Sequence, residues 1–342
     1  MVVGHDDRGT ERVVGEASRD HRFGQGSVPK MSLPFVTSRI GLGLAALGRP
    51  GYIDIGHGGD FAGRTDAQSM QAHAHAMLDA AYEAGVRYFD AARSYGRAEA
   101  FLGSWLTQRG IGTEEVGVGS KWGYTYTADW RIDAEVHEVK DLSIETLRRQ
   151  VGESRELLGS HLRLYQIHSA TLESGVFEDG AVLDELARLR EEGTAVGFTV
   201  TGPRQGEAIQ RGLEVGGFDA VQATWNLLEV SAGPSLEAAH AAGLGVIIKE
   251  AVANGRLTER GDVPLADIAR SVDATPDALA LAAVLAQPWA DVVLSGATTL
   301  AMLKSNLAAA RVELGEELLE RLGALREAPE SYWETRAALP WN

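Results

Sequence analysis

Four residues of this sequence have side chains that could together move a proton to or from a carbonyl oxygen: Asp90, Tyr95, Lys121 and His168. A free tyrosine phenol has a pKa of about 10, which is too high for an ideal acid at neutral pH. A neighbouring ammonium favours the phenolate and lowers that pKa, and Lys121 could supply this charge while Asp90 holds it in place. His168 could then orient the substrate by donating a hydrogen bond to the same oxygen. The residue types therefore predict acid–base chemistry on a carbonyl group or the matching alcohol.

Each of the four residues also has an ordinary structural explanation. Taken alone, an aspartate can cap a helix, a tyrosine can pack, a lysine can be a solvated charge, and a histidine can be hydrogen-bonded in the core. Their placement favours the chemical interpretation, because they follow three successive predicted strands in chain order. We therefore expect them to form one site.

Eight short apolar runs suited to buried parallel strands position these residues. The runs cover 40–44, 87–92, 116–120, 162–168, 195–200, 218–224, 245–248 and 291–294. Helical stretches lie between them, and in the first of these Met70, Ala74, Met77 and Ala81 fall on one face. Strands that alternate with helices predict a parallel sheet covered by helices. Eight such units predict a closed (β/α)8 TIM barrel, whose active site lies at the carboxyl ends of its strands.

The boundaries of the barrel follow from the same pattern. Thr65 and Gln68 predict a capping box at the start of the first helix, and Leu318, Leu322 and Leu325 predict an extra C-terminal helix. We assign residues 36–342 to one α/β barrel domain. Residues 1–35 are interpreted as a disordered tail or an upstream extension. They contain no apolar stretch of the kind found in a secretory signal.

Composition excludes several classes of protein. The 342 residues include no Cys, which excludes disulfide scaffolds, thiolate metal sites and Cys nucleophiles. The formal net charge of -16 argues against nucleic-acid or anionic membrane partners. The longest apolar run, 278–286, is too short to span a bilayer. With no export signal, we expect a cytoplasmic protein whose partner is a small molecule, and homo-oligomer formation is left open.

Two motifs that suggest other sites lack an essential part. Gly41 and Gly43 match a dinucleotide fingerprint, but a Gly-rich loop follows where that motif needs a helix. His137 and Glu138 begin a zinc motif whose second histidine is replaced by Asp141. We therefore predict neither a Rossmann unit nor a metal site.

The residues around the predicted site resemble the aldo-keto reductase superfamily. Residues 89–96 read FDAARSYG and residues 98–103 read AEAFLG, which is similar to that family's F-D-[TS]-A-x-x-Y-G-x-[SA]-E-x-x-L-G signature. Ser120-Lys121 and Gln166-Ile167-His168 resemble the family's next two motifs. The resemblance runs from about residue 40 to 325. It implies that the four residues above are a catalytic tetrad, and that a nicotinamide dinucleotide binds across the strand ends.

The resemblance also implies residues that bind the nicotinamide half of the cofactor. Thr199 stands in the family's G-x-S-N motif and keeps a hydroxyl, whereas Val200 replaces the amide. Gln222 matches a carboxamide-binding glutamine, and Ser169 follows the tetrad histidine. Lys249 stands near the position where many members place an aromatic residue, and would pair with Glu250 or with a diphosphate oxygen.

The phosphate-binding segment is less complete. Its candidate residues are Ser295, Gly296, Thr298, Asn306 and Lys304. Backbone N–H groups at the helix start would bind a phosphate. Met302 replaces the Arg or Gln that family members often have, so Lys304 is the candidate replacement. The family favours NADP, and NAD is the alternative.

Aromatic segments could enclose the substrate. Trp122, Tyr124, Tyr126, Trp130, Tyr332, Trp333 and Trp341 could wall a pocket for a sugar or an apolar carbonyl, or pack together as a lid. Residues 51–60 could also form a lid. Arg49, Arg64 and Arg93 could receive an acidic substrate or form ion pairs.

Three functions are weighed against one another. The first is an NAD(P)-dependent oxidoreductase that acts on a carbonyl, an alcohol or a sugar C1, with Tyr95 as general acid and base. The second is a barrel lyase that uses Lys121 or Lys249 to form a Schiff base. The third is a regulatory subunit that senses the cofactor with little turnover.

Overall fold

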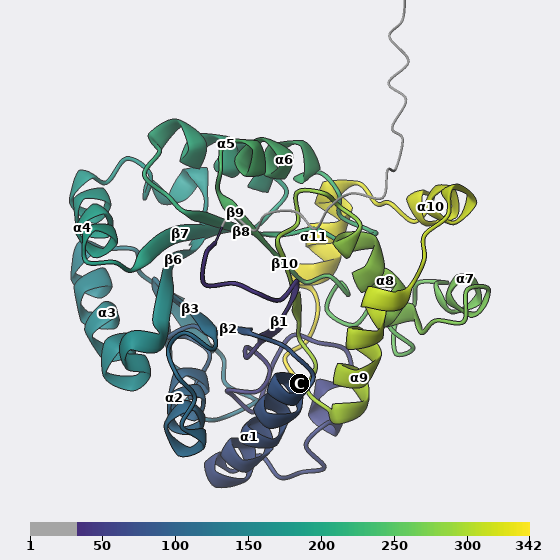
Figure 1. Cartoon of the computed structure of the whole chain (residues 1–342), viewed down its shortest axis with the longest axis horizontal. Helices are drawn as coiled ribbons and strands as arrows, with labels where there is room; N and C mark the ends of the chain where they lie inside the picture. Colours follow the sequence, from purple (N-terminus) through teal and green to yellow (C-terminus); the bar gives the residue numbers. More distant parts are fainter. Residues whose placement is uncertain (1–32) are drawn as a thin grey trace, which may run out of the picture. The chain divides into compact units, whose positions relative to one another are not determined.

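A closed barrel of eight parallel strands forms the centre of the computed structural model, which describes residues 33–342 (Figure 1). The strand order around the barrel is β1-β10-β9-β8-β7-β6-β3-β2. The strands are β1 (Ile40–Gly43), β2 (Tyr88–Asp90), β3 (Gly117–Trp122), β6 (Leu162–Ala170), β7 (Ala195–Val200), β8 (Ala220–Thr224), β9 (Gly245–Lys249) and β10 (Val292–Ser295). The predicted (β/α)8 barrel is confirmed.

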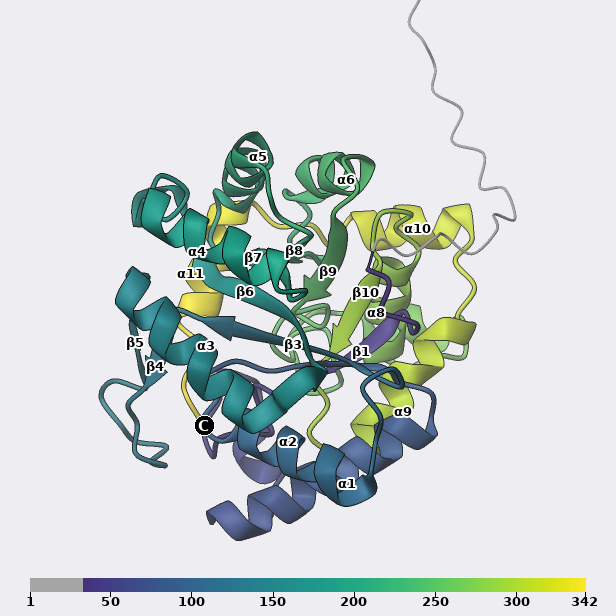
Figure 2. The same cartoon turned by 60° about the vertical axis from the view of Figure 1, so that its left-hand side comes forward.

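Helices surround this barrel as an outer ring (Figures 1 and 2). They are α1 (Ala67–Glu83), α2 (Ala98–Arg109), α3 (Ile144–Leu158), α4 (Gly180–Glu191), α5 (Gln205–Val215), α6 (Gly233–Ala241), α7 (Ala266–Arg270), α8 (Pro276–Leu285), α9 (Leu300–Ala308), α10 (Glu316–Gly323) and α11 (Pro329–Ala337). On α1 the predicted apolar face is buried against the barrel. The predicted cap is wrong by one residue, because the Asp66 carboxylate accepts the N–H groups of Gln68 and Ser69. A cap of this kind stabilises a helix by roughly 1 kcal/mol.

The amino-terminal mouth of the barrel is closed by apolar side chains. Leu33 and Val36 are buried and pack with residues from β2, β6, β8, β9 and β10. Gly245 allows this approach, since a Cβ there would lie 2.4 Å from the Leu33 side chain. The packed chain thus includes Leu33, which the sequence interpretation placed in the tail. Residues 1–32 of that predicted tail lie outside the described residues.

Two elements near the opposite mouth were missed by the sequence analysis. The segment between β3 and α3 contains an antiparallel hairpin of β4 (Tyr124–Tyr126) and β5 (Glu138–Lys140), and α11 follows the predicted last helix. The hairpin strands have only three residues each, too few to show alternation. Only Tyr332 and Trp333 of α11 are buried. Figure 2 shows the hairpin and α11 together on one side of the barrel.

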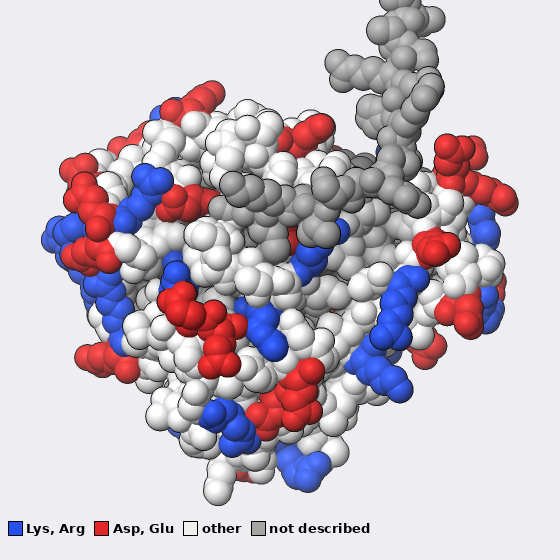
Figure 3. Space-filling model, in the orientation of Figure 1, with Lys and Arg blue, Asp and Glu red and all other residues white. Residues whose placement is uncertain are grey.

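Charged side chains of both signs alternate over the drawn face of the barrel (Figure 3). Many of them form surface ion pairs, such as Arg190 with Asp219 at 2.9 Å. Within residues 33–342, no helix has the length and apolarity needed to cross a membrane. The same residues contain no group of three or more His, Asp and Glu side chains suited to a metal ion.

Candidate active site

The carboxyl ends of the strands open onto a cavity of about 860 Å³. Its inner end is lined by residues at the strand ends and the loops above them, including Asp90, Tyr95, His168 and Gln222. Its outer end is lined by residues at and after the end of β10 and at the starts of α8 and α9. One continuous cavity is lined by both sets of residues. We use the names inner end and outer end for these two sets of residues.

The base of the inner end is a buried ion pair. The Lys121 ammonium contacts the Asp90 carboxylate and donates a 2.9 Å hydrogen bond to the carbonyl of Ala91. Both side chains are about 98% buried, and the second Asp90 oxygen accepts from Gln222 Nε2 at 3.0 Å. Burial lowers the pKa of Lys121, while Asp90 acts in the opposite direction. The pair and the glutamine therefore join β2, β3 and β8 under the cavity.

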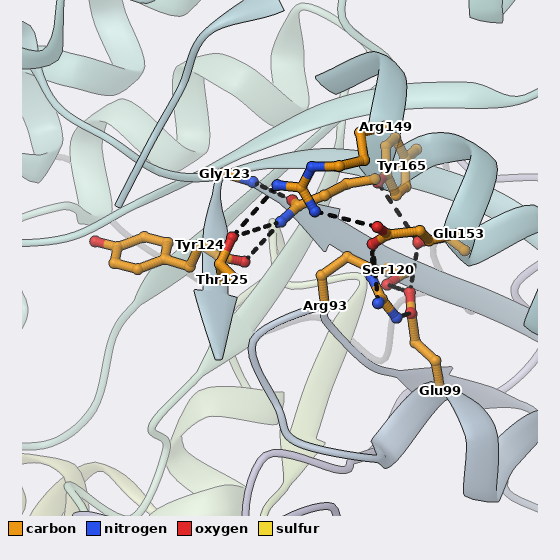
Figure 4. Close-up of polar contacts among 11 residues, drawn as sticks. Arg93, Glu99, Ser120, Gly123, Tyr124, Thr125, Arg149, Glu153 and Tyr165 are labelled. Carbon is orange, nitrogen blue, oxygen red and sulfur yellow. Dashed lines mark hydrogen bonds and ion pairs between the residues drawn. The ribbon is translucent and has the colours of Figure 1, made fainter. Parts of the chain in front are cut away.

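A second buried hydrogen-bond network fixes the strand next to Lys121. Glu99 of α2 accepts hydrogen bonds from Ser120 Oγ at 2.5 Å and Ser154 Oγ at 2.7 Å, and it pairs with Arg93 (Figure 4). Glu99 is 2% exposed, and Ser120 directly precedes Lys121 on β3. The network therefore fixes β3 to α2 and α3 at the point where the lysine emerges.

Tyr95 lies between two cations above this pair. The Lys121 ammonium is 4.8 Å from the centre of its ring, and the Arg49 guanidinium is 5.3 Å from it. A Cβ on Gly48 would come within 2.2 Å of the Tyr95 carbonyl, so only glycine allows the two loops to meet. Burial and Asp90 raise the pKa of Tyr95 well above its usual value, and Arg49 opposes them. The net direction is therefore opposite to the fall expected from Lys121, because burial has the largest influence on this phenol.

His168 faces Tyr95 across the same end of the cavity. The two rings meet edge to face, with centroids 5.6 Å apart. Burial, together with the charges of Lys121, Lys249 and Arg49, lowers the pKa of His168 well below its usual value. Its Nδ1 atom has no hydrogen-bond partner among the described residues. The imidazole is therefore neutral and can form a hydrogen bond with an uncharged oxygen.

The residues predicted to bind the nicotinamide half lie near Asp90, Tyr95 and His168, though not all of them lie on the cavity wall. Ser169 and Gln222 line the cavity. Thr199 lies behind the wall, where its hydroxyl accepts the Ser169 N–H at 2.7 Å. Ser169 has φ of +56°, an uncommon conformation for a residue other than glycine.

Lys249 belongs to a cluster that the sequence revealed only in part. Its ammonium donates to Thr224 Oγ1 at 2.9 Å and lies 3.8 Å from Glu250. The stronger partner of Glu250 is Arg336 of α11, whose Nε and Nη2 atoms lie 2.9 Å and 2.5 Å from the carboxylate. Burial lowers the pKa of Lys249 to about 8. Burial would raise the pKa of Glu250, but Arg336 and Lys249 outweigh it and lower that pKa to about 2.

The C-terminal residues complete the wall of the inner end. Trp341 stacks on His137 with ring centroids 3.9 Å apart, and Arg49 lies 4.8 Å over the Trp341 ring. Arg49 also pairs with Glu138 of β5 at 2.9 Å. The backbone groups of Asn342 and Tyr52 exchange two hydrogen bonds. The C-terminal residues Trp341 and Asn342, the β4–β5 hairpin and the 51–60 loop therefore meet above Tyr95.

The predicted aromatic residues divide between this wall and the core. Tyr124 and Trp341 line the cavity. Trp122, Tyr332 and Trp333 are instead buried in the hydrophobic core. Of the three arginines named from the sequence, only Arg49 lines the cavity.

The outer end is held together by hydrogen bonds around Asp277. Its carboxylate accepts from Ser305 Oγ at 2.9 Å and from Asn306 Nδ2 at 2.7 Å, and Asn306 Oδ1 accepts from Ser295 Oγ at 2.7 Å. The sequence analysis missed Asp277, because an acid just after Pro276 is typical of a helix start.

Three of the residues predicted to bind a phosphate differ in whether they line the cavity. Gly296 lines the cavity, and a Cβ there would meet nothing within 4 Å. Thr298 instead donates to Asp60. Lys304 is exposed and is not among the cavity-lining residues. The structure therefore does not bring Lys304 to the site as the sequence analysis expected.

Comparison with solved structures supports the fold. An aldo-keto reductase from Bacillus halodurans in its holo form superimposes with a TM-score of 0.65 at 21% identity, covering 85% of this chain and 93% of that one. A glycerol dehydrogenase from Gluconobacter oxydans gives a TM-score of 0.64 at 20% identity, covering 86% and 94%.

Comparison of sequences identifies the family as well as the fold. The chain is 25% identical over 295 residues to an uncharacterized oxidoreductase of Bacillus subtilis, YrpG, covering 75% of this chain and 89% of that protein. It is 26% identical over 318 residues to the protein tas of Escherichia coli, covering 76% and 91%. Residues 39–327 match the model of the aldo/keto reductase family. The chain therefore belongs to the aldo/keto reductase family of oxidoreductases.

Proposed function

We propose that this protein transfers hydride between a nicotinamide dinucleotide and a small carbonyl compound, or in reverse from an alcohol or a sugar C1. The observation that carries the proposal is the arrangement around Tyr95. A buried Asp90–Lys121 pair lies beneath the phenol, and a neutral His168 meets it edge to face. This arrangement offers one proton donor, one nearby cation and one neutral hydrogen-bonding group at the same end of a cavity.

The residues present fit a nicotinamide dinucleotide. The cavity volume of about 860 Å³ lies within the usual range for ligand sites. Gln222 and Ser169 offer an amide and a hydroxyl at the inner end, and Gly296 leaves its backbone open at the outer end. When bound, this cofactor supplies or accepts the hydride.

In the direction of reduction, the Tyr95 hydroxyl donates its proton to the carbonyl oxygen. Burial keeps the phenol protonated until that moment, because it raises the pKa of Tyr95. The nearby charges of Lys121 and Arg49 stabilise the phenolate as it forms. In oxidation, the phenolate takes the proton back from the alcohol, and His168 orients the oxygen in both directions.

The substrate side of the inner end suits a sugar or an apolar carbonyl. Arg49 and Glu138 offer polar groups next to the aromatic rings of Tyr52 and Trp341. Aromatic faces with a few fixed polar groups are typical of pockets that bind sugars as well as apolar carbonyls.

The test of the function is the Tyr95→Phe variant. We expect its turnover on a panel of carbonyls and sugars, followed at the nicotinamide absorbance band, to fall to background. Its affinity for the cofactor, measured by fluorescence titration, should remain close to that of the wild type. Tyr82→Phe is the matched control, because the Tyr82 hydroxyl bonds Glu115 away from the cavity. Unchanged turnover in the Tyr95 variant would refute the proposal.

A Schiff-base lyase is the second candidate, and one observation favours it. Lys249 lines the cavity, and burial lowers its pKa to about 8, so part of it is a neutral amine near neutral pH. Lys121 is less suited, because Asp90 holds its ammonium below the cavity wall. Borohydride trapping of a carbonyl substrate on Lys249, detected by mass spectrometry and absent in Lys249→Met, would establish this candidate. We expect no trapping.

A further inference from the structure

We propose that the outer end of the cavity selects NAD over NADP. The inference rests on the proposed function, which places the nicotinamide at Tyr95 and His168. A dinucleotide whose nicotinamide lies at the inner end must place its adenosine half elsewhere in the same cavity. The outer end is the part of the cavity that residues of α8 and α9 line.

Within residues 33–342, the side chains that α8, α9 and the cap residue of α8 contribute to the cavity wall include one carboxylate and no cation. They include Asp277 with the neutral Thr275, Ser305, Asn306 and Met302. The cations that line the cavity within residues 33–342 are Arg49, Lys249, Arg260 and Arg336, and none belongs to α8 or α9. A 2′-phosphate carries a charge between about −1 and −2 at neutral pH. At this end it would face Asp277 without a counter-ion.

All four of these cations are already paired with carboxylates. Arg49 pairs with Glu138, and both Lys249 and Arg336 contact Glu250. Arg260, the lining cation that reaches toward the loop before α9, lies 2.6 Å from Asp60, and Asp60 also accepts from Thr298. A 2′-phosphate would therefore have to compete with Asp60 for Arg260.

Asp277 is also held in place, so it does not swing away from a ligand. Ser305 and Asn306 each donate to one of its oxygens, and the Ser305 and Thr275 hydroxyls lie 2.6 Å apart. A carboxylate has about four acceptor positions, so two remain after these bonds. A ribose hydroxyl can donate to such a position, whereas the phosphate dianion has no hydrogen to donate and is repelled by the carboxylate. The geometry therefore suits the free 2′-hydroxyl of NAD.

The first test measures binding rather than turnover. Titration of the full chain with NADH and NADPH, followed by fluorescence, should give a dissociation constant at least about 10-fold lower for NADH. Equal affinity, or tighter binding of NADPH, would overturn the inference and leave the proposed function standing. If neither bound at cofactor concentrations that saturate ordinary dehydrogenases, the proposed function itself would fail.

Variants at the outer end test the cause. Asp277→Asn keeps the shape and can still bond Ser305 and Asn306, so it should reduce the preference for NADH by about 10-fold. Met302→Arg adds a cation to the wall and should strengthen NADPH binding at least 10-fold, with little change for NADH. Unchanged ratios in both variants, with wild-type melting temperatures, would contradict the role of Asp277.

Two matched controls examine the remaining cations. Lys304→Ala changes an exposed side chain off the wall and should leave both affinities unchanged. Arg260→Met combined with Asp60→Asn removes both charges of this pair and should leave the ratio of the two affinities unchanged. A selective loss of NADPH binding in either variant would identify a counter-ion for the 2′-phosphate and would overturn the inference.

Discussion

The two ends of the cavity hold charge in different ways. At the inner end, the carboxylates of Asp90 and Glu250 are paired with Lys121 and Arg336. At the outer end, the carboxylate of Asp277 is held by neutral donors alone. Buried ion pairs are costly to desolvate and are no sure source of stability. Their concentration around Tyr95 is consistent with a site that must stabilise charge during a reaction. Under the proposed function, the outer end has only to recognise the shape and the hydroxyl groups of the adenosine half of the cofactor.

The largest expected effect comes from breaking the deepest ion pair of the inner end. Lys121→Met should reduce kcat/KM by about 10² to 10⁴-fold, because the cation beside the phenolate is lost. It should also lower the free energy of unfolding by roughly 3–5 kcal/mol, since Asp90 is left buried without its partner. Steady-state kinetics and urea unfolding measure the two effects.

A double variant separates catalysis from stability at this pair. Asp90→Asn combined with Lys121→Met removes both charges, so most of the lost stability should return while activity stays low. If activity recovered together with stability, the pair would serve the fold rather than the reaction. The inner end would then resemble the outer end in purpose.

The second-largest expected effect is the loss of stability when the ion pair of Glu250 and Arg336 is removed, and its size depends on pH. Glu250 has a pKa of about 2 in the folded protein against 4.5 as its ordinary value. A depressed carboxyl pKa contributes stability that is fully present above pH 4.5 and is lost as the pH falls toward 2. Glu250→Gln should therefore cost roughly 3 kcal/mol at pH 7, and this difference from the wild type should shrink below pH 4.5.

Urea unfolding of both proteins at several pH values between 7 and 3 measures this prediction. Glu114→Gln is the control, because Glu114 is exposed and its pair with Arg163 is on the surface. Its effect should stay below about 1 kcal/mol at every pH. A difference for Glu250→Gln that does not change with pH would show that Arg336 does not depress the Glu250 pKa.

The sequence predicts the strands well, and it predicts that Asp90, Tyr95, Lys121 and His168 lie together, because both depend on local patterns. Each barrel strand is a short apolar run, and the tetrad residues stand at or just beyond the ends of such runs, where a barrel places its site. The features that it does not predict involve partners far apart in the chain. Arg336 reaches Glu250 across 86 residues, from a helix with only two buried side chains. Lys304 shows the opposite error, since its sequence position fits a phosphate site but its helical phase turns it to solvent.

The smallest expected loss of stability comes from a substitution at the outer end of the cavity. Ser305→Ala removes one of the two donors to Asp277 and leaves Thr275 without its partner. Because Ser305 is a neutral donor and Asp277 keeps the hydrogen bond from Asn306, the free energy of unfolding should fall by only about 1 kcal/mol. The preference for NADH over NADPH should persist, since the charge of Asp277 is unchanged. Urea unfolding and fluorescence titration of the same preparation measure both quantities. If the free energy of unfolding fell by as much as it does for Lys121→Met, the outer end would depend on its polar network as strongly as the inner end depends on its ion pairs. The proposed difference between the inner end, where the reaction occurs, and the outer end, which recognises the cofactor, would then be wrong.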